Sequence, residues 1–358
     1  MDRAKPKISS DLPWIQPEDG PAILGNHRQD VEEALDGLVN VQSQGLQTML
    51  RYHLGMSDEY GNPISSNQGK RFRSSLSIFA CKAVGGSIPT ILPAAAAIEL
   101  VHNFSLIHDD IQDNDLERRH RATLWALWGK PKALQAGNVM RTMADLVIQQ
   151  LNKHCDDDAM VANCSRLLTA GYLETVEGQF LDLSYEGRTD IDTSKYLNMI
   201  SKKTGALIRT SMNIGALIGH GDKDTVKALA NCGEYLGYVF QVRDDYLGTW
   251  GSESETGKAI GNDIMRKKNS LPIVHAIEHA DSVSRQRLKI LYQKEHLVDQ
   301  DIQEILDILS QVGTAGYVKE LAEKQATYAI SALEDVKIDI ALRNEFQELV
   351  HFLLTRKQ

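Results

Sequence analysis

Hydrophobic residues recur every three to four positions along most of the chain, which is the period of an amphipathic helix. No segment shows the sustained alternation of apolar and polar residues that is typical of a strand. The expected helices span residues 29–54, 70–86, 90–115, 131–154, 157–185, 193–218, 222–248, 270–280, 283–293, 299–311, 313–336 and 341–355. Long helices joined by short loops predict an all-α antiparallel bundle, in which a ligand site forms in a central cavity between facing helices.

Turn-forming residues mark the limits of this helical region. Residues 1–25 contain several prolines and glycines and are expected to form an irregular lead-in. No linker divides residues 26–358, so we expect them to form a single domain. Residues 249–269 contain several glycines and predict a long loop, and loops of that length in compact domains are usually functional.

Composition and charge exclude some classes of protein. The chain has 358 residues and a formal net charge of −9, which argues against a nucleic-acid partner. Its 4 cysteines form no C-x-x-C pair and are expected to be reduced thiols of a cytoplasmic protein. The N-terminus lacks a signal-peptide pattern, and no apolar run approaches the roughly 18 residues that span a bilayer, so we expect no transmembrane segment.

The strongest candidate for a metal-binding site lies at the end of the helix predicted for residues 90–115. At helical spacing, Asp109 and Asp113 lie one turn apart on one face, almost in line with His102. Acidic clusters are often solvated surface, but this one directly follows the apolar run 104–107, which indicates a buried helix. Converging carboxylates repel one another and need cations. Oxygen donors without cysteine favour Mg²⁺ over zinc or iron.

A second acidic pair, Asp244 and Asp245, closes another strongly apolar helix, predicted for residues 222–248. The two pairs hold metal ions between them if their helices face each other; the alternative is two unrelated helix ends. Basic residues lie near both pairs or at the start of another helix, and any one of them alone would be ordinary surface. They are Lys70, Arg73, Arg118, Arg119, Lys203, Lys258 and Lys268. Together they indicate a polyanionic ligand whose phosphates Mg²⁺ bridges to carboxylates.

From about residue 30 to the C-terminus, these motifs resemble those of the trans-isoprenyl diphosphate synthases. This polyprenyl synthetase family includes farnesyl and geranylgeranyl diphosphate synthases. The motifs are Gly69–Arg73, Ser105–Asp113, Arg118–Arg119, Gly178–Leu183, Lys203–Gly205, Phe240–Asp245, Gly257–Lys258 and Ser270–Pro272. The resemblance implies the type I isoprenoid synthase fold and a Mg²⁺-dependent trans-prenyltransferase. Its substrates would be isopentenyl diphosphate and an allylic diphosphate, namely dimethylallyl, geranyl or farnesyl diphosphate.

The resemblance also implies a role for each residue of the site. Three Mg²⁺ ions, which Mn²⁺ can replace, would be bound by Asp109, Asp113 and Asp244, with Asp110 and Asp245 as near neighbours. The allylic diphosphate would be held by Arg118, Lys203 and Lys258. Isopentenyl diphosphate would be held by Lys70, Arg73, His102 and Arg119. Four further residues resemble those that line the cavity in the family: Gln179, Asp182, Thr204 and Gln241. Lys268 is a further expected substrate contact.

Several positions depart from the family pattern or bear on the product. Gly248 stands where many members have Asp, so we expect one outer-sphere metal contact to be lost. Ser74 replaces a common proline. The aromatic Phe104, five residues before Asp109, and the small Ser105 resemble producers of C20 chains more than of C15 chains. Geranylgeranyl diphosphate is therefore the expected product, with farnesyl or geranylfarnesyl diphosphate as alternatives, although the ring of Phe104 could equally be ordinary core.

Two rival functions on the same fold remain open. A terpene cyclase needs no isopentenyl diphosphate site, so the basic residues assigned to that site argue against it. A regulatory subunit of an active synthase would be expected to lose acids of the first motif, and Gly248 is the feature that favours this rival. The resemblance further implies a homodimer that forms through bundle helices.

Overall fold

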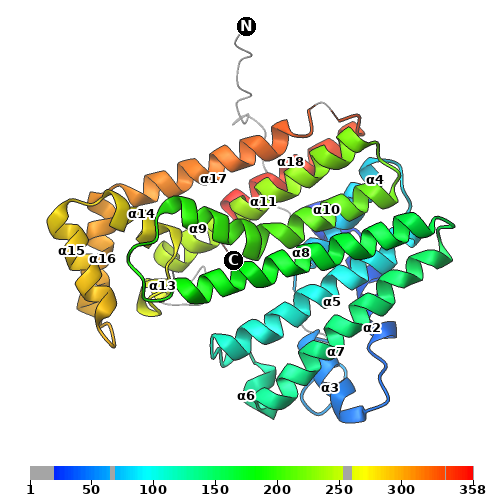
Figure 1. Ribbon diagram of the computed structural model, residues 1–358, viewed down its shortest axis with the longest axis horizontal. Coiled ribbons are helices and arrows are strands. Elements are labelled where there is room, and N and C mark those ends of the chain that lie inside the picture. Colours follow the sequence, from blue (N-terminus) through cyan, green and yellow to red (C-terminus); the bar gives the residue numbers. More distant parts are fainter. Residues whose placement is uncertain (1–19, 65–68, 253–259, 335, 358) are drawn as a thin grey trace, which may run out of the picture.

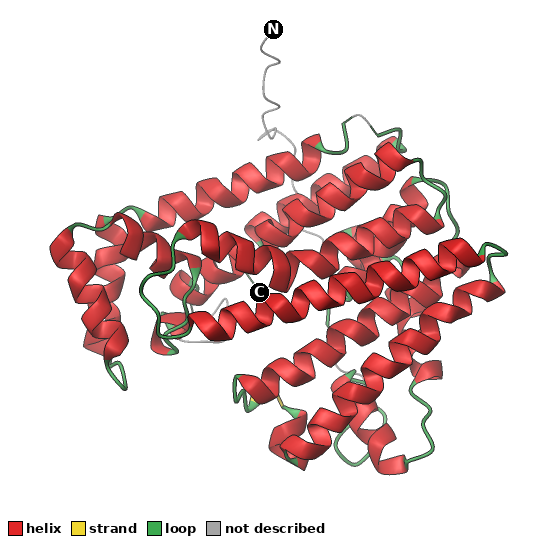
Figure 2. Cartoon of the chain, viewed as in Figure 1, coloured by secondary structure: helices red, strands yellow, loops and turns green. Residues whose placement is uncertain are grey.

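The computed structural model describes residues 20–64, 69–252, 260–334 and 336–357. Helices form nearly all of the regular structure in these ranges (Figure 2). The one sheet described has two short antiparallel strands, β1 (Glu117–Arg118) and β2 (Arg121–Ala122), which the sequence did not predict. The predicted all-α class is confirmed.

Most of the helices begin and end within a few residues of the predicted boundaries. The first part of the chain forms α1 (Ala22–Gly25), α2 (Arg28–Leu38), α3 (Gln44–His53), α4 (Phe72–Ala83), α5 (Ile88–Gln112), α6 (Leu124–Trp128), α7 (Lys130–Ile148), the 3-10 helix η1 (Gln149–Lys153) and α8 (Asp158–Tyr185). The second part forms α9 (Thr193–Ile200), the π-helix η2 (Ser201–Gly205), α10 (Ala206–Ile218), α11 (Lys223–Trp250), α13 (Asn262–Met265), α14 (Leu271–His279), α15 (Ser282–Gln293), α16 (Asp299–Gln311), α17 (Thr314–Ser331) and α18 (Ile340–Thr355).

The long helices lie roughly side by side and form the body of the molecule, while α15 and α16 lie at one end (Figure 1). Helix α10 packs against α4, α8 and α11, and α5 packs against α4 and α7. One buried hydrophobic cluster joins the helices around α5 and α7, and a second joins α4, α10, α11, α17 and α18. The C-terminal ends of α5 and α11, which carry the acidic motifs, emerge from these two clusters.

The helix predicted for residues 29–54 is wrong as a single element. It is divided into α2 and α3 by residues 39–43, where Ser43 has extended backbone angles of φ −81° and ψ 107°. Serine favours such a position before a helix over the helix interior, and the fully buried Val39 anchors the break in the core. The helix predicted for residues 193–218 contains the π-helix η2, which the sequence pattern did not reveal.

Helix α5 is long and apolar enough to meet a test of length and composition for a membrane span, although we expected no apolar run to approach that length. It has 25 residues, and 67% of its most apolar window, of mean hydropathy 1.4, is buried inside the protein. Among the described helices it is the one that meets this criterion of length and composition. A helix at the centre of a bundle has the same composition, because it meets other helices on every side.

The two predicted irregular segments are only partly described. Residues 1–19 of the lead-in lie outside the described residues, and its end forms the short helix α1. In the predicted loop of residues 249–269, α11 continues to Trp250 and α13 forms a further short helix. Residues 253–259 of this loop lie outside the described residues.

Candidate active site

The first acidic motif lies at the C-terminal end of α5, where the helix leaves the core. Asp109 and Asp113 are half-buried. Asp110 is buried, and its Oδ1 accepts a hydrogen bond from Arg118 Nε of β1 at 2.7 Å. Burial raises the pKa of Asp109 to about 6, against the opposing effect of Lys203, and burial also raises the pKa of Asp113. A bound cation would therefore stabilise the charged form of both groups.

Lys203 lies on the π-helix η2, which is packed backbone against backbone between two long helices. A Cβ added to Gly178 of α8 would lie 2.1 Å from the backbone nitrogen of Lys203, and one added to Gly237 of α11 would lie 2.5 Å from Cα of Gly205. Widened turns of this kind are frequent at functional sites. The Nζ of Lys203 donates to Asp182 of α8. Burial acts to lower the pKa of Lys203, but the carboxylate of Asp182 helps to outweigh it, and the pKa is raised.

In the second acidic motif, Asp245 ties several helices together. It is buried in α11, and its carboxylate accepts hydrogen bonds from the hydroxyl of Tyr196, from the backbone nitrogen of Leu271 at 2.8 Å and from Nε2 of Gln241 at 3.0 Å. The Oε1 of Gln241 in turn accepts from Thr204 Oγ1 of η2 at 2.8 Å. Burial raises the pKa of Asp245 to about 7, although the hydrogen bonds from Tyr196, Leu271 and Gln241 lower it.

Asp244 has different surroundings from its neighbour. It is half-exposed and forms an ion pair with Arg356, close to the C-terminus. Arg356 is buried, its guanidinium lies 4.3 Å from the ring centroid of Phe240, and its carbonyl oxygen accepts from Arg243 Nη2 at 2.8 Å. The end of the chain therefore reaches the second acidic motif, a placement that no spacing in the sequence indicates.

A cavity of about 830 Å³ lies between the two acidic motifs. Predicted site residues on its wall are Asp113, Asp182, Lys203, Gln241, Asp244, Asp245 and Lys268. Asn262, Asp263 and Arg266, which sequence reasoning missed, also line the cavity. They follow the glycine-rich segment and belong to no recognised motif, so only the folded chain reveals them.

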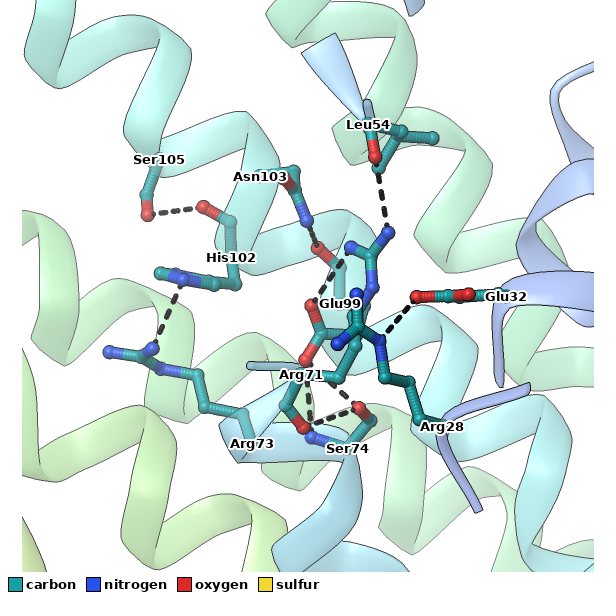
Figure 3. Close-up of polar contacts among 10 residues, drawn as sticks. All are labelled: Arg28, Glu32, Leu54, Arg71, Arg73, Ser74, Glu99, His102, Asn103 and Ser105. Atoms are coloured by element: carbon teal, nitrogen blue, oxygen red, sulfur yellow. Dashed lines mark hydrogen bonds and ion pairs between the residues drawn. The ribbon is translucent and has the colours of Figure 1, made fainter. Parts of the chain in front are cut away.

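The residues predicted to hold isopentenyl diphosphate gather at the start of α4. Arg73 Nη1 lies 3.1 Å from Nε2 of His102, as Figure 3 shows. A Cβ added to Gly69 would lie 2.8 Å from the guanidinium of Arg119, so the turn before α4 lies directly against that side chain. Burial, followed by the charges of Arg73 and Arg119, holds the pKa of His102 well below its usual range. Lys70 lies in the same turn, and its Nζ is 5.1 Å from the ring centroid of Phe352.

A buried ion pair beneath this cluster was not predicted from the sequence. The Oε2 of Glu99 lies 3.7 Å from Arg71 Nη1, and both side chains are buried (Figure 3). Oε1 of Glu99 accepts from the backbone nitrogen of Ser74 at 3.2 Å and from its hydroxyl at 3.0 Å. Arg71, at the N-cap of α4, has a φ of 47° and also donates to the carbonyl oxygen of Leu54 at 3.2 Å. The serine in place of a common proline is the one sequence signal, because proline has no N–H to donate.

The remaining predicted residues occupy varied positions. Gln179 Nε2 donates to Gln112 Oε1 at 3.1 Å, close to the first motif. The ring of Phe104 is buried in edge contact with His108 and Tyr172. Ser105 donates through its hydroxyl to the carbonyl oxygen of His102 at 2.8 Å, as seen in Figure 3. Lys258, predicted to hold the allylic diphosphate, lies outside the described residues.

The sequence model named Polyprenyl synthetase matches residues 57–309 of the chain. The chain belongs to the polyprenyl synthetase family. The (2E,6E)-farnesyl diphosphate synthase of Mycobacterium tuberculosis is 32% identical to it over 338 residues, which cover 94% of this chain and 93% of that one. The geranylgeranyl diphosphate synthase of the same organism is 35% identical over 317 residues, covering 88% of this polyprenyl synthetase and 89% of the relative.

A solved structure agrees with this family membership. The crystal structure of a polyprenyl synthetase from Streptomyces coelicolor A3(2) has a TM-score of 0.85 to this polyprenyl synthetase and 31% sequence identity, and the match covers 93% of this chain and 98% of that one. The predicted family, the type I isoprenoid synthase fold and the enzyme class, a trans-prenyltransferase, are confirmed.

Proposed function

We propose that this polyprenyl synthetase condenses isopentenyl diphosphate with an allylic diphosphate and forms mainly geranylgeranyl diphosphate. The observation that carries the proposal is the cavity lined by both acidic motifs, with Lys203 on its wall and a separate basic cluster near α4. Two separate sets of basic residues match two diphosphate substrates, whereas a terpene cyclase binds one diphosphate substrate and needs one such set. The intact first motif argues against a regulatory subunit.

The donor set fits a hard divalent cation, Mg²⁺ or its substitute Mn²⁺. Asp109, Asp113 and Asp244 offer only oxygen atoms. Within the described ranges, no three His, Cys, Asp or Glu side chains lie close enough together to hold an ion by themselves. That arrangement suits Mg²⁺, which commonly uses one or two carboxylates and completes its shell with substrate phosphates and water. We expect three ions between the carboxylates and the diphosphate.

The first chemical step is the ionisation of the allylic C–O bond. When bound, the metal ions supply positive charge to the departing diphosphate. Lys203 and Arg118 provide fixed cations for the same leaving group, and fixed charges act strongly where water is excluded. Lys258 is the third cation that the family resemblance implies for this role. Met199 and Ile200 supply apolar side chains to a part of the cavity wall, against which the allylic tail can lie.

The second step joins the two substrates. Lys70, Arg73, His102 and Arg119 hold the diphosphate of isopentenyl diphosphate, so that its C3–C4 double bond faces the allylic cation. The double bond supplies the electron pair for a new carbon–carbon bond, and a proton then leaves C2. The released diphosphate accepts this proton, so the step requires no side-chain base.

Phe104 is the proposed floor for the growing chain. Its ring centroid lies 4.4 Å from that of His108 and 5.2 Å from that of Tyr172, so three rings pack together next to the first acidic motif. The relatives include both farnesyl and geranylgeranyl diphosphate synthases, so farnesyl diphosphate and the longer geranylfarnesyl diphosphate are the alternative products.

The face formed by α7 and α8 is the proposed homodimer interface. Five large apolar side chains on these two helices are exposed to solvent. They are Leu134, Leu146, Leu173, Val176 and Phe180. A second copy of the chain would cover them, since exposed apolar patches commonly mark protein interfaces.

Incubation of the pure protein with isopentenyl diphosphate, Mg²⁺ and each allylic diphosphate, followed by sizing of the products, tests the proposed function. We expect C20 chains from wild type and loss of turnover in Asp109→Ala with the circular dichroism spectrum retained. Asp307→Ala, on the exposed face of α16, is the matched control and should remain active. Wild-type rates in Asp109→Ala would refute the metal assignment, and a hydrocarbon formed without isopentenyl diphosphate would identify a cyclase.

A further inference from the structure

The turn between β1 and β2 carries a histidine on the wall of the active-site cavity. The strands pair Arg118 with Arg121, so Arg119 and His120 are the two residues of the turn. Both have positive φ angles, 53° for Arg119 and 60° for His120, as in the type I′ turns that suit two-residue hairpins. Glycine adopts this conformation without steric cost, whereas a residue with a Cβ meets resistance. The turn itself therefore gives no reason for an imidazole at this position.

Contacts on both strands hold the turn in place. On β2, Arg121 donates from Nη1 to the carbonyl oxygen of Tyr52 at 3.0 Å, and its guanidinium lies 3.9 Å from the centroid of the Tyr52 ring. On β1, Arg118 donates to Asp110 of the first acidic motif at 2.7 Å. The backbone of His120 is therefore fixed relative to α3 and α5. A group held in this way loses little freedom when a ligand binds to it.

Three consecutive residues of the hairpin lie against three different parts of the site. Arg118 contacts the end of α5, and the guanidinium of Arg119 lies against Gly69 in the turn before α4. His120 is exposed and lines the cavity between the two acidic motifs, which Lys203 also lines. Among the residues that the structure describes, the imidazole of His120 has no hydrogen-bond or ion-pair partner. Its N–H group can therefore donate to a ligand in the cavity.

We propose that His120 is a further diphosphate-binding residue of this enzyme, and that its imidazole donates a hydrogen bond to the diphosphate held between the two acidic motifs. The inference rests on the proposed function above, which supplies the ligand. A hydrogen bond to a charged group typically changes a dissociation constant about tenfold or more. Loss of the imidazole should weaken diphosphate binding by that factor, whereas a purely conformational role for the residue predicts no such loss.

Isothermal titration of the full-length protein with inorganic pyrophosphate in the presence of Mg²⁺ tests the proposal without turnover. His120→Gly removes the imidazole and relieves the backbone, so we expect the dissociation constant to rise about tenfold. A thermal scan should show an unchanged or higher Tm, which excludes unfolding as the cause. His120→Gln keeps an N–H donor on a side chain of similar reach and should recover most of the affinity that His120→Gly loses.

The matched control is His220→Gly. His220 is also exposed and has a φ of 62°, so glycine relieves the same backbone conformation there. It lies in the turn between α10 and α11, at the opposite end of α11 from the second acidic motif. The control should therefore bind pyrophosphate like wild type.

The outcomes separate this inference from the proposed function. Wild-type affinity in His120→Gly, or an equal loss in His220→Gly, would overturn the inference and leave the proposed function intact. Binding by His120→Gln that is no better than binding by His120→Gly would also overturn it, because a donor at this position would then have no effect. Failure of the wild-type protein to bind pyrophosphate with Mg²⁺ would refute the proposed function and the inference with it.

Discussion

The substitution Glu99→Gln tests whether the buried ion pair with Arg71 positions the basic cluster at the start of α4. Glutamine keeps an oxygen acceptor for Ser74 but removes the charge opposite a buried guanidinium. Breaking a buried pair from one side costs about 3–5 kcal/mol. Because the pair is separated by 3.7 Å and Arg71 also donates to Leu54 at 3.2 Å, we expect the lower end of that range, about 3 kcal/mol.

The expected cost translates into a measurable change in thermal stability. At about 2.1 cal/mol/K per residue, a chain of 358 residues has an unfolding entropy of about 0.75 kcal/mol/K, so a cost of about 3 kcal/mol lowers Tm by about 4 °C. Scanning calorimetry measures this shift. In steady-state kinetics we expect a several-fold increase in KM for isopentenyl diphosphate, because Arg73 loses the support of the first turn of α4. The KM for the allylic diphosphate should change little.

Ser74→Ala is the control for this experiment. It removes the hydroxyl bond to Glu99 but keeps the backbone N–H bond at 3.2 Å and the charge pair with Arg71. A typical hydrogen bond contributes about 1 kcal/mol, so Tm should fall by about 1 °C. If Glu99→Gln lowers Tm by no more than Ser74→Ala, or leaves KM for isopentenyl diphosphate unchanged, the charge pair does not position the cluster and the reasoning is refuted.

Two further predictions concern acid stability and product length. Burial, aided by neighbouring arginines, lowers the pKa of His53 to about 3, so below about pH 6.5 the unfolded chain binds a proton that the folded chain does not. The free energy of unfolding therefore decreases as the pH is lowered. Between about pH 7.5 and 5.5, His53 accounts for about 1.4 kcal/mol of this decrease, or about 2 °C in Tm, and this part should be absent in His53→Gln. Equal pH profiles in the two proteins would contradict this. Phe104→Ala should lengthen the products sized by chromatography if its ring is the floor, and an unchanged product distribution would assign the ring to the core alone.

The helical period of the sequence was sufficient to predict the fold class and the setting of both acidic motifs. The apolar residues before Asp109 and Asp244 indicated helices that run through the core, and carboxylates at the ends of such helices point to an interior site. These predictions depend only on the spacing of residues within one segment of the chain, so the sequence of that segment is enough to make them. The break between α2 and α3 was missed because Val39 is as hydrophobic as a helical core residue, and its backbone conformation is set by packing.

The features that sequence reasoning missed depend on contacts between distant segments. The π-helix that carries Lys203 forms where α8 and α11 press against its backbone, and Gly178 shows this only once the helices are placed. Arg356 reaches Asp244 from the far end of the chain. Asp263 enters the space beside Gly248 only because α13 packs on α11. Each depends on which helices are neighbours, and periodicity carries no such information.

The paired aspartates of each motif are alike in sequence but differ in the folded protein. Successive residues on a helix are rotated by about 100°, so two adjacent carboxylates cannot have the same surroundings. Asp110 is buried against Arg118, and Asp245 is buried among hydrogen bonds from α9, α11 and α14, whereas Asp109 and Asp244 are more exposed. One acid of each pair therefore fixes neighbouring elements, and the other lies nearer the surface, where Asp244 pairs with Arg356. We therefore expect the more exposed acid of each pair, and not the buried one, to bind metal directly.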